Sequence, residues 1–439
     1  ARVRLPRTVK SRYDLSRIHR GDLVFLVDYE NGELFGPFFA RSPRVRVEKN
    51  PRTGPFNGEH PTARYLYESI DIDCSQSCAG GIPVNGLDLD ERPFFLDPES
   101  SSLVVETLRY RNRPSDLVVL DLDLGPHRLK ATVVESVLDT RGALSTRIFN
   151  RSARLDGPLL DSLEALRRRG DRLLHRNAER ELVPLLEDLG SLVHKQLLEE
   201  LLDGTRSERY TLHIRGGDKA LGIPFEVAAN RGFLFQRRVL AFRVQDEESS
   251  DRVHLRRVLI IADPGRRFPR AYEEGCMLYD LFGSAGLETD LLSRPLDRET
   301  VIRVMKEYDL VHFAGHAGGE PAGWDLGTDL LQTACLLPAA GPGEQRRPAL
   351  VFSSCCGSTL PLGACLLRTG TVNAVASRWQ HPDRDMSGFL KGFYGRLLVG
   401  QEIGYAFHHT QVACFPRNPL SGLFVLMGES RVVYEKHRS

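Results

Sequence analysis

The 439-residue sequence has no excess of either charge, because 59 lysines and arginines are balanced by 58 aspartates and glutamates. Binding to a phosphate backbone requires a clear excess of Lys and Arg, so composition gives no overall signal for nucleic acid. The start of the chain is the basic exception, with one acid, Asp14, among Arg2, Arg4, Arg7, Lys10, Arg12, Arg17 and Arg20. We interpret this segment as a solvated arm, and the lack of a following apolar segment argues against a signal peptide.

Cysteine is scarce, and its eight residues are unevenly spaced, which excludes the disulfide framework of a small secreted domain. We therefore expect a cytoplasmic protein. Cys74, Cys78 and His60 would supply only part of a zinc site, which normally has four ligands, so we predict no metal and no other cofactor. Residues 349–367 carry no charge over nineteen positions, but their serines and glycines and Pro361 favour a buried strand, turn and helix over a membrane span.

Residues 1–95 are predicted to form a small β-rich domain. Apolar runs at Asp22–Asp28 and Glu33–Ala40 are separated by a turn containing Asn31-Gly32, the strongest short signal for a hairpin. The pattern GDLVFLVDYENGELFGPFFA resembles the strand pair of PUA-like domains, including their EVE and plant development-and-cell-death relatives. That resemblance implies a sensor or docking domain that binds RNA or a modified base, whereas a plain β-barrel scaffold is the alternative.

Residues 96–250 change character and mix strands with helical periodicity. Apolar positions at helical spacing extend over Asp161–Leu202 and are interrupted by Gly170 and Gly190. A strand is predicted at Phe233–Ala241. Three further strands are predicted in this region, at Asp116–Leu124, Leu129–Leu138 and Thr211–Ile214.

Residues 251–439 alternate strands and helices after a polar linker predicted at Gln245–Arg252. Repeated βα units imply an α/β fold, with a mostly parallel sheet flanked by helices. Strands are predicted at Val258–Ala262, Thr289–Leu292, Leu310–Ala314, Ala349–Phe352, Val372–Ser377 and Leu423–Met427, and helices at Ala271–Phe282, Asp297–Tyr308, Leu360–Thr369 and Asp385–Leu398.

His316 and Cys355 follow two of these apolar strands, in DLVHFAGHAGG and ALVFSSCCGS. Chemistry collects at the carboxyl edge of an open α/β sheet, and the 39-residue interval is near the roughly 50 residues typical of caspases. A helix beginning near Leu360 would bring positive potential to the thiol, and His316 could accept its proton. A buried, inert cysteine and a structural histidine are the alternative, but their joint placement at matching strand ends favours catalysis.

Two neighbouring residues are predicted to be structural. His312 lies within its strand, four residues before His316, and Cys356 should point to the face opposite Cys355.

Four segments in order, DLVHFAGHA, VFSSCCG, TVNAVASRWQHPD and GLFVLMGE, resemble the CHAT branch of the caspase-like (clan CD) cysteine proteases. The resemblance implies a Cys–His dyad at Cys355 and His316, no metal, and peptide-bond hydrolysis through an acyl-enzyme. It also implies that residues 96–250 are a degenerate, non-catalytic half preceding a catalytic domain at 251–439. Prokaryotic relatives often act on a protein substrate in defence or programmed-death pathways, under an activating partner subunit or a sensor domain.

The sequence departs from the family pattern at two positions. Ala317 replaces the usual Gly after the histidine, and the backbone N–H groups of Ala317 and Cys355 are the predicted oxyanion hole. Cys356 stands where an acid is more common. A catalytically inactive caspase-like scaffold, whose N-terminal domain binds RNA, a nucleotide or a protein, is therefore the alternative function.

Substrate preference is predicted from two positions near the dyad. Ser353, two residues before the cysteine, lacks the acid that related proteases use for basic P1 residues. Arg378 could reach the pocket and favour an acidic or polar P1 residue, while a solvated arginine is the alternative. The segment 339–348 reads as a flexible loop and is a candidate for ordering or cleavage on activation.

Overall fold

A computed structural model of the chain describes the strands of residues 1–114 and most of residues 116–436. Between 116 and 436 the description omits 126–127, 139–143, 156, 176–178, 204, 206–209, 218–221, 230–231, 245–251, 320–321, 337–346, 356–358 and 380–384. The chain forms two compact units, Ala1–Pro114 and Ser115–Ser439. The predicted domain boundaries near residues 95 and 250 stay predictions.

The first unit contains a six-stranded antiparallel sheet with the order β1-β5-β3-β2, to which β4 and β6 add at β5 and β3. The hairpin predicted around Asn31-Gly32 is confirmed, since β2 and β3 pair from Asp28 opposite Glu33. Part of the predicted arm is a strand, β1, and the Cys74, Cys78 and His60 group lies outside the described residues. The strands are β1 (Arg2–Arg7), β2 (Leu23–Asp28), β3 (Glu33–Ala40), β4 (Arg46–Lys49), β5 (Leu66–Asp73) and β6 (Ile82–Pro83).

The second unit is built on one eleven-stranded sheet, and seven of its ten strand pairings are parallel. The predicted mostly parallel α/β fold is therefore confirmed. In order across the sheet the strands are β14 (Glu288–Leu292), β13 (Arg257–Ala262), β15 (Leu310–Gly315), β19 (Leu350–Cys355), β20 (Asn373–Ser377), β21 (Phe424–Gly428), β11 (Leu240–Arg243), β10 (Tyr210–Gly216), β7 (Asp116–Leu124), β8 (Arg128–Leu138) and β9 (Leu144–Arg154).

Strand direction reverses once within the parallel part of this sheet, where β20 meets β21 in antiparallel pairing. Strands β14 to β20 run one way, and β21, β11, β10 and β7 run the other. The carboxyl edge that carries Cys355 therefore belongs only to β14–β20.

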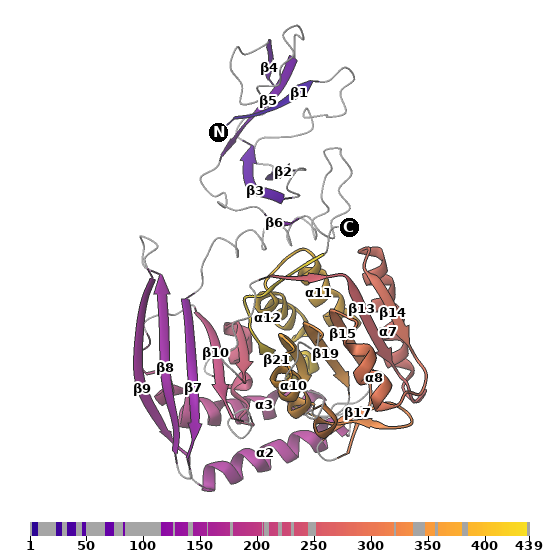
Figure 1. Cartoon of the computed structure of the whole chain (residues 1–439). Coiled ribbons are helices and arrows are strands. Elements are labelled where there is room, and N and C mark those ends of the chain that lie inside the picture. The colour runs from indigo at the N-terminus through magenta and orange to yellow at the C-terminus, as the bar shows by residue number, and fades with distance from the viewer. Residues whose placement is uncertain are drawn as a thin grey trace. The chain divides into compact units, whose positions relative to one another are not determined.

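Helices cover both faces of the sheet (Figure 1). Successive residues of β13 alternate between two cores: Val258 and Ile260 pack with α7 and α11, and Leu259 and Ile261 pack with α8 and α10. Burying both faces explains why these strands read as continuous apolar runs. The main helices are α2 (Gly157–His175), α3 (Glu179–Val193), α7 (Pro269–Ser284), α8 (Arg298–Met305), α10 (Leu360–Arg368), α11 (Ser387–Leu398) and α12 (Ile403–Cys414).

Shorter elements complete this unit. A small sheet after β15 contains β16 (Ala317–Gly318), β17 (Gly323–Asp325) and β18 (Leu330–Leu331), and β12 (Arg252–Leu255) pairs with β22 (Val433–Lys436). The short helical segments are η2 (His194–Leu198), α4 (Glu199–Leu201), η3 (Phe225–Val227), α6 (Leu234–Arg237), α9 (Thr333–Leu336) and η5 (Pro419–Leu423).

The prediction of one strand over Phe233–Ala241 is wrong, because a helical turn, α6, occupies Leu234–Arg237 before the strand β11 begins at Leu240. Phe233 and Phe235 both lie edge-on to Phe415, with ring centroids 5.4 and 5.1 Å away. Tertiary packing of these rings outweighs the local strand propensity of the segment.

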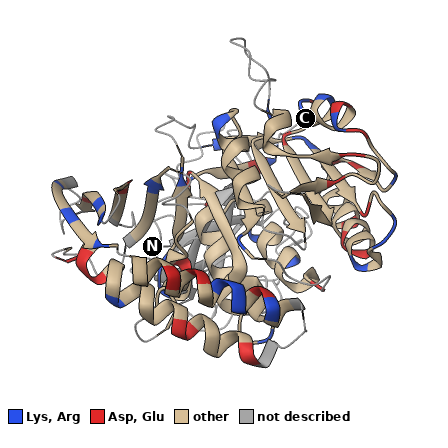
Figure 2. Ribbon diagram, turned by 90° about the horizontal axis from the view of Figure 1, so that it is seen from below, with Lys and Arg blue, Asp and Glu red and all other residues tan. Residues whose placement is uncertain are grey.

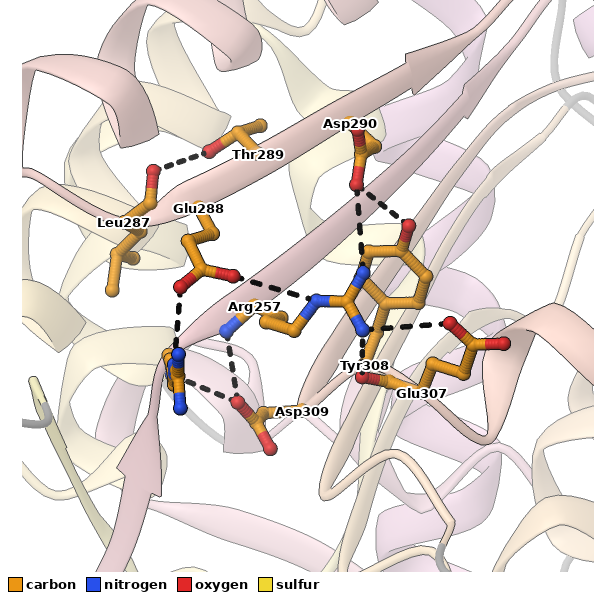
Figure 3. Close-up of polar contacts among 9 residues, drawn as sticks. Arg257, Leu287, Glu288, Thr289, Asp290, Glu307, Tyr308 and Asp309 are labelled. Carbon is orange, nitrogen blue, oxygen red and sulfur yellow. Dashed lines mark hydrogen bonds and ion pairs between the residues drawn. The ribbon is translucent and has the colours of Figure 1, made fainter.

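The edge strand β14 is attached to its neighbours by a polar network at one end of the sheet (Figure 3). Arg257 lies over the Tyr308 ring at 4.5 Å and within 3.6 Å of Glu288. The Tyr308 hydroxyl donates to Asp290 at 2.6 Å, and burial together with this carboxylate raises the pKa of Tyr308 to about 12. The network protects an exposed sheet edge with charge.

Basic and acidic positions are interspersed along the ribbon in Figure 2. On α2, for example, Glu164 pairs with Arg167 and Arg168, which lowers the pKa of the Glu164 carboxyl to about 2. In the part of the chain that the structure describes, no helix is long and apolar enough to cross a membrane. The uncharged stretch 349–367 forms β19 and α10, as predicted.

Candidate active site

The two predicted catalytic residues come from neighbouring strands of the sheet. Strands β15 and β19 are parallel and in register, with Gly315 opposite Cys355. His316 follows Gly315 directly, so the backbones of the two residues meet at the same carboxyl edge. This pairing turns a 39-residue separation in sequence into adjacency in space.

The Cys355 side chain is buried, with 1% of the residue exposed. Its Sγ lies 3.1 Å from Ser353 Oγ and 3.8 Å from Thr359 Oγ1. Ser353 Oγ also accepts a hydrogen bond from Trp324 Nε1 at 2.7 Å. The Trp324 ring is itself fixed by stacking on Phe313 at 4.5 Å. A chain of polar contacts thus connects the thiol to a rigid aromatic pair.

Thr359 is the N-cap residue directly before α10, and it is fully buried. Its N–H donates to the carbonyl of Ser377 at the end of β20, at 2.8 Å. Pro361 lies in the first turn of α10, where its missing N–H costs no helical hydrogen bond. The positive end of α10 is therefore next to the sulfur, as predicted from the sequence, and such a position favours a thiolate.

His316 is oriented by Phe268, in the loop before α7, and by Asp325, at the end of β17. Its ring stacks on Phe268 with centroids 5.3 Å apart, and its carbonyl accepts the N–H of Asp325 at 2.9 Å. Asp325 also pairs with Arg267, which closes a ring of contacts around the histidine. Sequence reasoning missed Phe268 and Asp325.

The loop that carries Phe268 has two residues in the left-handed region, Asp263 with φ 43° and Arg266 with φ 55°. Buried Asp263 holds the turn by accepting the N–H of Arg267 at its side chain, at 2.8 Å. Strained backbone of this kind gathers at functional sites. The signal available in the sequence was the Asp-Pro-Gly turn directly after an apolar strand.

His312 lies on the α7 and α11 side of the sheet, opposite the side of Cys355, as a structural residue. Its Nδ1 is 2.9 Å from the Tyr394 hydroxyl and its Nε2 is 2.8 Å from Glu274. All three residues are buried, and burial, with the Glu274 charge, raises the pKa of Tyr394 well above its usual value. The group links β15 to α7 and α11.

The remaining predicted site residues occupy defined positions. Ala317 lies in β16 opposite Trp324, and its φ is not positive, so alanine fits there as well as glycine. Ser353 is 4% exposed and touches the thiol, as described above.

Arg378 is buried and donates two hydrogen bonds to Glu226, 2.5 and 3.1 Å long. A role for Arg378 in substrate binding stays a prediction, and it requires this pair to open. Cys356 and 339–346 lie outside the described residues.

The CHAT domain family model matches residues 183–421, more than half of the chain, and the chain therefore belongs to the CHAT domain family. The PUA-like resemblance of residues 1–95 stays a prediction. A comparison with curated proteins finds no match.

Two solved structures of the separase–securin complex of Saccharomyces cerevisiae are similar to the chain at a distance. One is 13% identical with a TM-score of 0.38, over 56% of this chain and 17% of the other. The second is 10% identical with a TM-score of 0.47, over 71% of this chain and 30% of the other. The chain thus spans less than a third of the length of these structures.

Proposed function

We propose that the protein is a caspase-like cysteine endopeptidase, with Cys355 as nucleophile and His316 as general base. The observation that carries this proposal is the register of β15 and β19, which brings the two residues to one sheet edge beside the start of α10. Its substrate would be a specific protein in a prokaryotic defence or programmed-death pathway, on the strength of the family resemblance alone.

The proposed reaction has two stages. His316 accepts the Cys355 thiol proton, and the thiolate attacks the carbonyl carbon of the scissile peptide. The N–H groups of Ala317 and Cys355 stabilise the resulting oxyanion. The imidazolium then donates its proton to the leaving amine, which gives a thioester. Water, deprotonated by His316, hydrolyses that thioester and restores the thiol.

The burial of Cys355 supports a resting form of such an enzyme. A peptide carbonyl cannot reach the sulfur of a residue that is 1% exposed. We therefore propose that segments flanking Cys355 rearrange before catalysis.

The dyad is tested by single substitutions. Cys355→Ala and His316→Ala should each abolish cleavage while the fold is retained. When two residues act as a catalytic unit, removing either one removes most of the rate enhancement that both provide. Cys356→Ala should remain active and is the matched control. Cleavage would be followed with a proteome-derived peptide library and mass spectrometry. Activity retained in Cys355→Ala, or lost only in Cys356→Ala, would show that the nucleophile is misassigned.

Specificity is tested with the same library. Because Ser353 supplies no carboxylate, we expect cleavage after Arg or Lys to be poor. A dominant basic P1 residue would contradict this assignment.

A further inference from the structure

A buried ion pair joins two segments that are far apart in sequence. Arg378 follows β20, and Glu226 lies in η3, 152 residues earlier. Their side chains are 5% and 3% exposed, and the guanidinium binds both carboxylate oxygens. The guanidinium also lies over the Phe242 ring at 5.4 Å. Buried ion pairs are a poor source of stability, since desolvation offsets their attraction, so a role in fixing geometry is the stronger explanation.

The pair is two contacts from the candidate nucleophile. Ser377, directly before Arg378, accepts the N–H of Thr359 at 2.8 Å. Thr359 Oγ1 in turn lies 3.8 Å from Cys355 Sγ. Movement of the Ser377–Arg378 backbone would therefore displace the start of α10 relative to the sulfur.

The segment Ser377–Trp379 is also held at a second point, by helix α2. The ring of Trp379 packs on α2 so closely that a Cβ on Gly170 would lie 2.7 Å from it. The segment η3 is fixed against α3, where the N–H of Ala229 donates to the Gly190 carbonyl at 2.9 Å. Helices α2 and α3 and η3 all belong to residues 96–250, the predicted non-catalytic half.

We propose that Glu226 is a positioning residue for the candidate active site. Through Arg378 it holds the end of β20, and thereby Thr359 and the start of α10, in the place that favours a reactive Cys355. This makes the preceding half of the unit a required part of the catalytic apparatus. The inference rests on the proposed function of Cys355 as nucleophile.

The test measures the reactivity of Cys355 in the full chain without any substrate. Site-resolved mass spectrometry would follow iodoacetamide labelling between pH 5 and 9, with buried Cys365 as the internal reference. In Glu226→Gln we expect the pH profile of Cys355 to move up by about one unit and labelling at pH 6 to slow about tenfold, because a displaced helix start stabilises the thiolate less. Glu226→Asp should recover part of the rate.

Two further variants separate positioning from stability. Glu226→Leu with Arg378→Met replaces the pair by apolar groups, which proteins often tolerate; we expect it to fold with an unchanged melting temperature and to label slowly. Glu135→Gln removes a carboxylate that is equally buried and paired with Arg147 on β8–β9, and it should label like the unaltered protein.

The outcomes distinguish this inference from the proposed function. If Cys355 of the unaltered chain labels no faster than Cys365 even when cell extract is added, the nucleophile assignment fails. If it labels fast and the apolar double variant labels equally fast with the same pH profile, the pair is only structural and the positioning role is overturned.

Discussion

His213 is a buried histidine whose surroundings keep it neutral. It lies in β10, is fully buried, and places Nε2 2.7 Å from Ser430 Oγ. Its Nδ1 has no hydrogen-bond partner among the described atoms. Burial, together with the positive charges of Arg243 and Arg431, lowers the pKa of His213 to about 3. The folded chain therefore disfavours the protonated form of His213 relative to the unfolded chain.

We expect this residue to make the second unit sensitive to acid. The unfolded chain binds a proton at His213 below its ordinary pKa of 6.5, whereas the folded chain binds it only near a pKa of about 3. The contribution of His213 to the free energy of unfolding is therefore fully present above pH 6.5. It falls by about 1.4 kcal/mol for each pH unit between pH 6.5 and about 3. Thermal unfolding from pH 7.5 to 4.5 would measure the slope, which should be shallower in His213→Gln. Equal slopes would contradict the assignment.

Glycines inside α2 and α3 permit close contacts between elements. Gly190 of α3 approaches η3 so closely that a Cβ would lie 1.9 Å from the carbonyl oxygen of Val227. Gly170 of α2 meets Trp379 in the same way. Both residues interrupt the helical pattern in sequence, yet each helix continues through its glycine. Packing therefore explains residues that local helix propensity disfavours.

Alanine at one of these glycines should change the free energy of unfolding in the opposite direction from alanine at a glycine with open space around it. Gly170→Ala should lower the free energy of unfolding by about 1–3 kcal/mol, since overpacking displaces Trp379. Gly395→Ala in α11, where a Cβ would meet nothing within 4 Å, should raise it by about 0.5–1 kcal/mol through helix propensity. Urea unfolding monitored by tryptophan fluorescence would measure both. Stabilisation by Gly170→Ala would show that the contact with Trp379 is loose.

At the scale of the whole molecule, the chain combines an antiparallel β unit, Ala1–Pro114, with the α/β unit that holds the candidate site. The buried thiol suggests that activity depends on a signal from outside the site. A ligand or partner can supply such a signal only by binding the active form more tightly than the resting form.

We expect the isolated full chain to be nearly inactive, because ordering the segments around Cys355 costs conformational entropy that a partner must offset. Turnover of the full chain would be compared with that of a chain beginning at Ser115, each with and without cell extract. Extract should activate the full chain more than the shortened one. High and equal turnover in all four conditions would mean that the first unit docks a partner and does not control activity.

Local sequence pattern was sufficient for much of the fold and for the positions of the candidate dyad. Apolar runs of strand length, each followed by a turn, predicted β13, β15, β19 and β20, since buried parallel strands have this pattern on both faces. His316 and Cys355 were found because each directly follows or ends such a run.

Only the tertiary structure decided how those elements combine. The reversal of strand direction at β21, the turn α6, the stacking of Phe268 on His316 and the Glu226–Arg378 pair all depend on contacts between residues distant in sequence. Arg378 shows the reason most directly. A solvated, a substrate-binding and a buried arginine have the same local sequence, and the partner 152 residues away decides which of them it is.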